Sequence, residues 1–307
     1  MTSLSDGLSA AMMTHDPGEC QEASTRARKD HGMTDLEFIQ VGELAKGMVG
    51  EPPPAVTHLA GRSLRLAFAD GTAARLTFSA GHTLEWEWLE GPQAGGRETD
   101  TYWACRPRDG IYFVDFVKAS QRATSVSIVL DLGAAAATIV VGTLPAASEV
   151  RKSLFDLANE GADLTAVGAR FLAAAIDRPF DAASHHQRPT AEMVGKRVKY
   201  VYSPTETYEH SYLNDKLYTW QCLAGIEKGL ADTDRCHAIK LGEQLYFFVW
   251  REKVVPTLGV VVADWRNMKS VGKLFGYETS DFGALVNAPI AASATLVNVA
   301  DHAELKG

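Results

Sequence analysis

Residues 98–116 read ETDTYWACRPRDGIYFVDF, and residues 232–250 read DTDRCHAIKLGEQLYFFVW, in register at a shift of 134 residues. The same shift aligns residues 59–71, LAGRSLRLAFADG, with residues 193–205, MVGKRVKYVYSPT, without a gap. Identical residues recur at this offset in the pairs Gly61/Gly195, Trp86/Trp220, Leu89/Leu223, Gly91/Gly225, Thr99/Thr233, Asp100/Asp234, Ala104/Ala238, Tyr112/Tyr246, Phe113/Phe247 and Val126/Val260. A constant offset over this length indicates an internal repeat, so we expect two copies of one domain.

Each copy carries the two-residue period of β-strands. In residues 62–68 the large apolar side chains fall at every second position, and Val198, Tyr200 and Tyr202 alternate in the same way. Turn residues, as at 70–71, separate such runs at a spacing of roughly ten residues. We predict an all-β protein of two tandem up-and-down barrels, since closure removes the unpaired edges of a sheet. The expected domains are a disordered tail over 1–34, a β-barrel over 35–147, a helical linker over 148–190 and a second β-barrel over 191–307.

The predicted linker has apolar residues at helical spacing. They recur in two runs, Leu154, Leu157, Ala158 and then Val167, Phe171, Leu172, Ala175. This pattern predicts helices that pack against a barrel and end before Pro179. His185 and His186 follow in a polar segment, and adjacent side chains point in different directions, so we expect a solvated linker there rather than a metal site.

The composition argues against several classes of partner. The net charge is -8 and the pI is near 5.6, whereas nucleic-acid-binding domains carry a basic footprint. No run of about 18 apolar residues occurs, and residues 1–34 lack the apolar core of a secretion signal, so no membrane partner is expected. Four scattered cysteines without a CxxC pair favour reduced thiols in the cytoplasm.

Several longer phrases carry a family resemblance. They are VGELAKG, YFVDF, SVSIVLDLG and VGTLP in the first half, and YSPTETYEHSYLND, YTWQCL, GLADTDRC and FVWREKVVPTLG in the second. With these phrases the chain resembles the MoaF family over nearly everything past the tail. The resemblance implies tandem calycin-like, lipocalin-type β-barrels, and it implies no agreed set of catalytic residues.

The second half also resembles, more faintly, the phenolic acid decarboxylases, which are calycin-fold lyases without a cofactor. Their Tyr-x-Tyr strand looks like Tyr200-Val201-Tyr202, and their strand-end glutamate looks like Glu252. The resemblance implies that the tyrosines hold a substrate carboxylate and that the glutamate transfers a proton. The arginine that this family uses has no motif match here, and Arg235 is taken in its place.

The repeat offset also compares the two copies position by position. Tyr200 and Tyr202 stand where the first copy has leucine and phenylalanine, and Glu252 stands where it has lysine. Arg235 and His237 stand where it has threonine and tryptophan. Strand parity puts Tyr200 and Tyr202 on one face of their strand, and Arg235 and His237 on one face of theirs. If these faces and that of Glu252 point inward, the second barrel encloses all five side chains.

This set of residues suits proton-transfer chemistry. Glu252 would act as general acid or base, because an apolar barrel raises the pKa of a buried carboxyl towards neutrality. Arg235 would hold a substrate carboxylate or oxyanion, Tyr200 and Tyr202 would donate hydrogen bonds, and His237 would assist proton transfer. The walls that bind the substrate are expected from aromatic residues on the same strands, Trp220, Phe248 and Trp250.

Each candidate also has a purely structural explanation. Glu252 could be a solvated strand end, and Arg235 could simply pair with Asp232 or Asp234. The tyrosines and tryptophans could be barrel packing, and His237 could be a satisfied core or surface histidine.

In the first copy, Asp115 stands in an apolar strand, where an unpaired carboxylate is costly to bury. We therefore expect Asp115 to have a structural partner, with Arg106 or Arg122 as the candidates.

The sequence thus predicts a cofactor-independent lyase or isomerase, acting on a small aromatic or conjugated acid or phenol in the second barrel. GxGxxG, GxxxxGK[ST], HExxH and GxSxG motifs are absent, so neither a nucleotide cofactor nor a catalytic metal is expected. The first alternative is a lipocalin-like small-molecule binding protein without catalysis. The second is a protein-interaction module in which the first barrel supplies a scaffold and a homodimer face.

Overall fold

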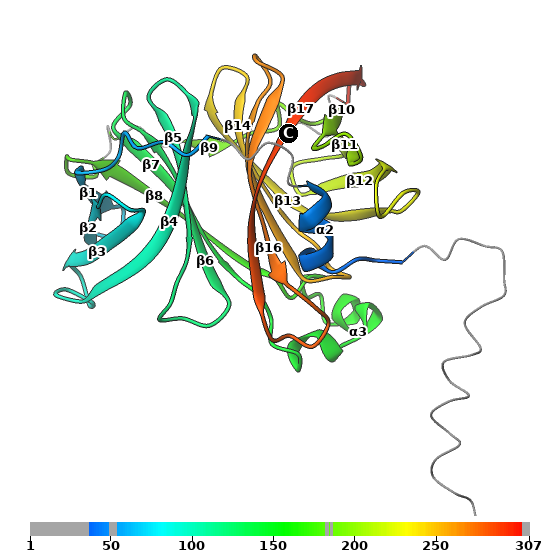
Figure 1. Cartoon of the computed structure of the whole chain (residues 1–307), viewed down its shortest axis with the longest axis horizontal. Helices are drawn as coiled ribbons and strands as arrows, with labels where there is room; N and C mark the ends of the chain where they lie inside the picture. Colours follow the sequence, from blue (N-terminus) through cyan, green and yellow to red (C-terminus); the bar gives the residue numbers. More distant parts are fainter. Residues whose placement is uncertain (1–36, 49–53, 182–183, 185–186, 303–307) are drawn as a thin grey trace, which may run out of the picture. The chain divides into compact units, whose positions relative to one another are not determined.

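The computed structural model describes residues 37–48, 54–181, 184 and 187–302 of the chain. The tail predicted over 1–34 and the pair His185 and His186 lie outside the described residues. Strands dominate the described part, and they form two tandem β-barrels (Figure 1). The prediction of an all-β fold with two barrels is therefore confirmed.

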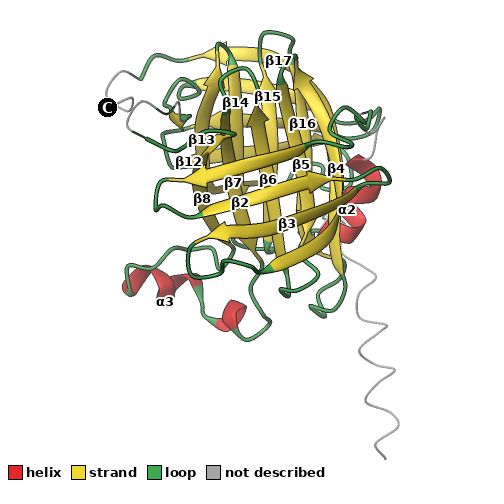
Figure 2. Cartoon of the chain, turned by 90° about the vertical axis from the view of Figure 1, so that its left-hand side faces the viewer, coloured by secondary structure: helices red, strands yellow, loops and turns green. Residues whose placement is uncertain are grey.

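The first barrel is a closed antiparallel cylinder whose strands follow one another in chain order. Its strands are β1 (Ser63–Phe68), β2 (Ala73–Phe78), β3 (Thr83–Glu90), β4 (Arg97–Arg108), β5 (Ile111–Val117), β6 (Thr124–Asp131), β7 (Ala136–Thr143) and β8 (Gly168–Ile176). Strand β8 closes the cylinder by pairing with β1, where Phe68 lies opposite Ala174. Strands β2, β3 and β8 of this barrel face the viewer in Figure 2.

The second barrel repeats this topology. Its strands are β10 (Lys196–Val201), β11 (Thr207–Tyr212), β12 (Leu217–Ala224), β13 (Ala231–Gly242), β14 (Leu245–Arg251), β15 (Thr257–Asp264), β16 (Lys269–Tyr277) and β17 (Leu285–Val299). Pairing of β17 with β10 and of β12 with β13 closes the cylinder. The short strand β9 (Arg188–Pro189) adds to β13 at Ile239 and Lys240.

The repeat is visible in the strand boundaries. Strands β2, β3, β4 and β5 reappear 134 residues later, with the same lengths, as β11, β12, β13 and β14. The correspondence ends at the last strand of each barrel, because residues 144–167 separate β7 from β8 whereas only residues 278–284 separate β16 from β17.

The connector between the copies is only partly helical. It contains the 3-10 helix η1 (Glu149–Arg151) and the helix α3 (Leu154–Asn159), whose first turn is capped by the Ser153 side chain. The prediction of a second helix over Val167 to Ala175 was wrong, because residues Gly168–Ile176 form strand β8 of the first barrel. Leu172 packs against the core of the first barrel while Phe171 packs against the core between the barrels, so both faces are apolar and no strand period shows.

The two barrels contact each other through equivalent outer faces. A shared core contains Phe113 of β5 and its repeat partner Phe247 of β14, both fully buried, with ring centroids 6.4 Å apart. Contact between equivalent positions is the pattern of an isologous interface, here formed within one chain.

A buried ion pair lies in the same interface. Asp115 of β5 and Lys273 of β16 are both fully buried, and Lys273 Nζ lies 2.9 Å from Asp115 Oδ1. The Asp115 carboxylate also accepts hydrogen bonds from Ser127 Oγ at 2.6 Å and Asn287 Nδ2 at 2.5 Å. The structural role expected for Asp115 is correct, but its partner comes from the second copy, so the sequence candidates Arg106 and Arg122 were wrong.

A short helix from the start of the described chain covers the second barrel. Helix α2 (Val41–Met48) precedes the first barrel in sequence, yet it packs against β16 and β17 (Figure 1). Its buried residues Val41, Leu44, Ala45 and Met48 follow the i, i+3, i+4, i+7 spacing of an amphipathic helix. Residues from the first half therefore form part of the second barrel's core.

Two further features concern the helices and the cysteines. None of the helices in the described part of the chain is long and apolar enough to cross a bilayer. The cysteines described, Cys105, Cys222 and Cys236, are buried and free. Burial raises the pKa of the Cys236 thiol to about 12, which keeps it protonated and unreactive.

Candidate functional site

The interior of the second barrel is lined by polar aromatic side chains. Strand alternation turns every second residue of β10, β11, β12 and β14 inward, and most of these positions carry rings, including several where the first barrel has aliphatic side chains. The inward ring-bearing residues are Tyr200, Tyr202, Tyr208, His210, Tyr212, Tyr218, Trp220, Tyr246, Phe248 and Trp250. The second copy therefore holds hydroxyl, imidazole and indole groups inside an otherwise apolar core.

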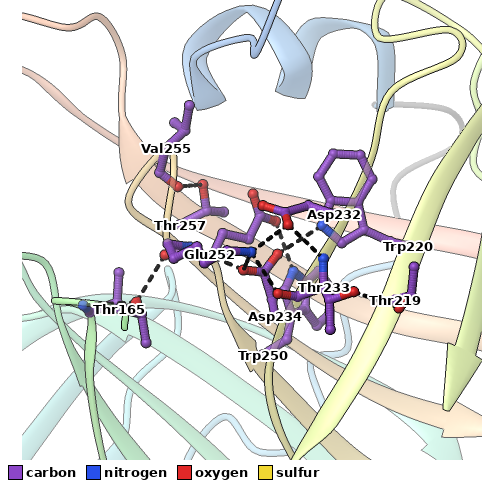
Figure 3. Close-up of polar contacts among 12 residues, drawn as sticks. Thr165, Thr219, Trp220, Asp232, Thr233, Asp234, Trp250, Glu252, Val255 and Thr257 are labelled. Atoms are coloured by element: carbon purple, nitrogen blue, oxygen red, sulfur yellow. Dashed lines mark hydrogen bonds and ion pairs between the residues drawn. The ribbon is translucent and has the colours of Figure 1, made fainter. Parts of the chain in front are cut away.

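Glu252 extends this inward face beyond the end of β14. Its Oε1 accepts a hydrogen bond from Trp250 Nε1 at 2.9 Å, and Thr165 Oγ1 donates to its backbone carbonyl at 2.9 Å (Figure 3). Burial raises the pKa of the Glu252 carboxyl well above its ordinary range, and the neighbouring carboxyl of Asp234 raises it further. By surface area the residue as a whole is half-buried.

Asp234 is the second carboxyl of this end of the barrel. Its Oδ2 accepts from Trp220 Nε1 at 2.9 Å, and its Oδ1 accepts from the Lys253 backbone N–H at 3.2 Å. The Lys253 ammonium pairs with Asp232 and lies 3.5 Å from Asp234 Oδ1. Burial raises the pKa of Asp234, although the Trp220 hydrogen bond and the Lys253 charge oppose the shift.

Two further buried glutamates lie in the loops at this end. Glu227 accepts from Tyr208 Oη at 3.0 Å and from the Ile39 backbone N–H at 3.2 Å, so it links the barrel to the residues preceding α2. Glu206 accepts from the Ile226 backbone N–H at 3.2 Å. Burial raises the pKa of both carboxyls. The mouth of the second barrel is thus rich in carboxyl groups.

His210 lies in the centre of the aromatic interior. Its ring centroid is 4.8 Å from that of Tyr200, 5.1 Å from Tyr218 and 6.0 Å from Trp250. Burial lowers the pKa of His210 to about 3, so its imidazole is neutral at physiological pH, and its Nδ1 has no hydrogen-bond partner.

A small cavity of about 30 Å³ lies between these groups and helix α2. The predicted residues Tyr202, Trp220, Trp250 and Glu252 line it together. The other lining residues are Leu44, Met48, Tyr208, His210, Tyr218, Glu227 and Leu274. The space suffices for a water molecule but not for an aromatic ring, which needs about 150 Å³ in an engineered protein cavity.

Two predicted residues lie just behind this cavity. The Tyr200 hydroxyl is 2.9 Å from that of Tyr212 and accepts from Trp265 Nε1 at 3.1 Å, so its hydrogen bonds are already made within the core. Phe248 stacks on Trp250 with ring centroids 5.8 Å apart. Both residues position the cavity walls rather than forming them.

Arg235 and His237 are not inside the barrel, contrary to the sequence prediction. Their β13 neighbours Asp234 and Cys236 point inward, so the alternation of the strand turns Arg235 and His237 outward. Arg235 Nε donates to Asp163 Oδ1 at 3.1 Å, and the His237 ring packs on Phe171 of β8 at 4.8 Å. The alternative partners considered for Arg235, Asp232 and Asp234, are therefore also wrong.

Several polar groups in the second barrel were not predicted, although comparison of the two copies reveals them. At the repeat offset, His210 corresponds to Leu76 and Glu227 corresponds to Gln93. The tyrosines at 208, 212 and 218 likewise replace alanine, phenylalanine and leucine. Positions at which the second copy is more polar than the first could therefore have identified these groups from the sequence. Within the described residues, no three His, Cys, Asp or Glu side chains are grouped as metal ligands.

Comparison with known proteins agrees with the two-copy organisation. Residues 36–146 match the model of the MoaF N-terminal domain, and residues 187–300 match that of the MoaF C-terminal domain. Protein MoaF of Klebsiella aerogenes is 42% identical over 275 residues, which cover 88% of this chain and 99% of that protein. A crystal structure from Burkholderia vietnamiensis with a provisional beta-lactamase name is 17% identical, covering 41% of this chain and 97% of that chain, but its TM-score of 0.28 supports no argument. The two domain matches and the full-length relative show that the chain belongs to the MoaF family.

Proposed function

We propose that the second barrel catalyses proton transfer on a small aromatic compound without a cofactor, as a lyase or isomerase, with Glu252 as general acid and base. The observation that carries the proposal is the Glu252 carboxyl, which is dehydrated and lines a cavity among aromatic side chains. A raised pKa brings such a carboxyl towards the pH at which it both gives and accepts protons.

The surrounding groups have distinct supporting roles in this proposal. Trp250 Nε1 donates to Glu252 and stabilises the carboxylate that forms when the proton leaves. Tyr202 and Tyr218 keep their protons because burial raises the pKa of both phenols, so they act as neutral hydrogen-bonding groups. Trp220 and Trp250 supply the aromatic walls. Tyr200 and Phe248 support those walls from behind.

The charge of the cavity narrows the class of substrate. Glu227 and Glu252 line the cavity, and none of the described residues that line it is cationic. With Arg235 on the outer face, an ionised substrate carboxylate would meet two carboxyl groups and no guanidinium. A phenol or another neutral conjugated compound is therefore favoured over an aromatic acid, which departs from the phenolic acid decarboxylase pattern.

Substrate entry requires a movement of helix α2. The cavity of about 30 Å³ is too small for an aromatic ring, and the side chains of Leu44 and Met48 form its cover. Displacing α2 would open the carboxyl-rich mouth of the barrel to solvent.

A non-catalytic carrier of small aromatic molecules is the alternative. The aromatic lining of the same cavity supports it, because rings and a few polar groups also suit reversible binding. The buried, free cysteines support residence in the cytoplasm for either function.

A turnover screen separates these functions. Wild type, Glu252→Gln and the exposed control Glu243→Gln would be incubated with phenols, hydroxycinnamic acids and aromatic amines, with mass spectrometry as the readout. Turnover that is lost in Glu252→Gln and kept in Glu243→Gln supports catalysis. Binding without turnover in all three proteins supports the carrier and contradicts the enzyme for these compounds.

A further inference from the structure

A second cavity lies between the two barrels, away from the barrel interior. It has a volume of about 750 Å³, and it is lined by β7 and β8 of the first barrel and by β9 and β13 of the second. This inter-barrel groove contains Arg235 and His237, the two predicted site residues that the fold turns outward. It shares no lining residue with the small cavity beside Glu252.

Two arginines stand side by side in the groove. Arg235 of β13 and Arg251 of β14 are direct cross-strand partners. Asp163 bridges them, with Oδ1 3.1 Å from Arg235 Nε and Oδ2 2.7 Å from Arg251 Nη2. Lys216 adds a further positive charge and Asp215 a negative one, so the ionised side chains that line the groove leave it net cationic. Asp163 already demonstrates the fit of a carboxylate between the two guanidinium groups.

Buried polar nitrogens without a partner gather in the same groove. Arg251 Nε, Gln187 Nε2 and His237 Nε2 make no hydrogen bond, although Arg251 and Gln187 are each only 8% exposed. The opposite end of the Gln187 amide is fixed, because its Oε1 accepts from Thr138 Oγ1. Buried polar groups in native proteins nearly always have a partner, so three orphans in one groove call for an explanation.

The remaining wall of the groove is apolar. Phe171 of β8 and Ile239 of β13 belong to the core between the barrels, and the Phe171 ring packs on the His237 imidazole at 4.8 Å. Burial, together with the charges of Arg251 and Arg235, lowers the pKa of His237 to about 4, so its ring is neutral at physiological pH. The groove therefore combines an arginine pair with an aromatic and aliphatic surface.

We propose that the inter-barrel groove binds a small organic anion, a carboxylate with an apolar body, with its oxygens at Arg235 and Arg251 and its body against Phe171 and Ile239. Gln187 and His237 supply the additional polar contacts. The site is independent of the proton-transfer function, because its residues lie on the outer face of β13 rather than in the barrel.

Calorimetric titration of the full-length protein with benzoate tests the proposal. Benzyl alcohol serves as the uncharged probe and inorganic phosphate as the anion without an apolar body. The variant Arg235→Gln removes the more exposed guanidinium of the arginine pair, and Glu252→Gln is the control for the barrel interior. Losing one charge-assisted contact should weaken benzoate binding by about 10- to 100-fold in Arg235→Gln.

Benzoate binding that weakens in Arg235→Gln, persists in Glu252→Gln and exceeds that of benzyl alcohol and phosphate supports the site. Three results overturn it: no benzoate binding to wild type, equal binding to Arg235→Gln, or loss confined to Glu252→Gln. His237→Phe keeps an aromatic ring against Phe171 but removes the imidazole nitrogens. It therefore tests whether the polar contact from His237 contributes to benzoate binding. Circular dichroism of each variant confirms that the fold is retained. Failure here leaves the turnover experiment unaffected, because that experiment addresses Glu252.

Discussion

The ion pair between Asp115 and Lys273 links the two barrels, and its contribution to stability can be tested by substitution. Both side chains are fully buried, and they come from β5 and β16 in different copies. The ammonium lies within ion-pair distance of Asp115 Oδ1 but is not aligned for a hydrogen bond, and burial lowers the pKa of Lys273 despite the neighbouring carboxylate. Replacing Lys273 by methionine keeps much of the side-chain volume and leaves Asp115 as an uncompensated buried charge.

The expected cost of Lys273→Met follows from what Asp115 retains. Removing one member of a buried pair costs about 3–5 kcal/mol, and we expect about 3 kcal/mol because Ser127 and Asn287 still donate to the carboxylate. The double variant Asp115→Asn/Lys273→Met should recover to within about 1 kcal/mol of wild type, since it leaves no buried charge at the pair. The new amide N–H can also donate to Asn287 Oδ1, which has no partner in the native protein.

Urea unfolding followed by tryptophan fluorescence and circular dichroism measures these differences. Arg266→Met is the control, because its ion pair with Glu243 is exposed and should contribute less than about 1 kcal/mol. A loss below about 1 kcal/mol for Lys273→Met would refute the reasoning. So would a double variant that is less stable than Lys273→Met alone, because the charge would then not be the source of the cost.

Two further predictions concern the cavity of the second barrel. Glu252→Gln should gain stability relative to wild type as the pH rises above about 4.5, at up to about 1.4 kcal/mol per pH unit, as measured by urea unfolding across the pH range. The sign follows because a buried carboxyl with a raised pKa costs the folded state increasingly once the unfolded chain ionises, and the cost levels off above the folded pKa. A difference that stays constant with pH would contradict the raised pKa of Glu252. Met48→Ala should cost about 2 kcal/mol and increase phenol binding measured by calorimetry, because it enlarges the cavity beneath α2. Met193→Ala is its matched control, buried in the same core but not lining the cavity, and equal phenol binding by both variants would rule out α2 as the cover.

Much of the fold follows from the sequence because the repeat and the strand period report the same architecture. The offset places β11 to β14 at the residues where β2 to β5 predict them. The sequence prediction fails at β8, because this strand packs against the first barrel on one face and the second barrel on the other. A strand covered on both faces loses the alternation that identifies it, and the apolar positions of Phe171, Leu172 and Ala175 then fit a helix equally well.

The candidate site was predictable only in part, and the reason lies in strand register. Parity shows that Trp250 and Glu252 share a face and that Arg235 and His237 share a face. The pairing of β13 with β14 decides how these faces relate: Cys236 lies opposite Trp250 inside the barrel, whereas Arg235 lies opposite Arg251 outside. A shift of one residue in this pairing would have exchanged the two faces. The sequence prediction therefore placed in one site two sets of side chains that the fold separates.

Helix α2 shows why the second barrel cannot be understood from the second copy alone. Leu44 and Met48 precede Gly61, where the repeat begins, so comparison of the copies cannot detect their role. The Ile39 backbone N–H donates to Glu227, and the Phe38 ring packs edge-on against Trp220, so the segment leading into α2 contacts the carboxyl and the indole that line the cavity. The cavity beside Glu252 is therefore lined in part by a segment that the family match assigns to the N-terminal domain. The two barrels thus differ in how they are filled, because the segment preceding the first copy packs into the core of the second barrel, while the interior of the first barrel is filled mainly by its own apolar side chains.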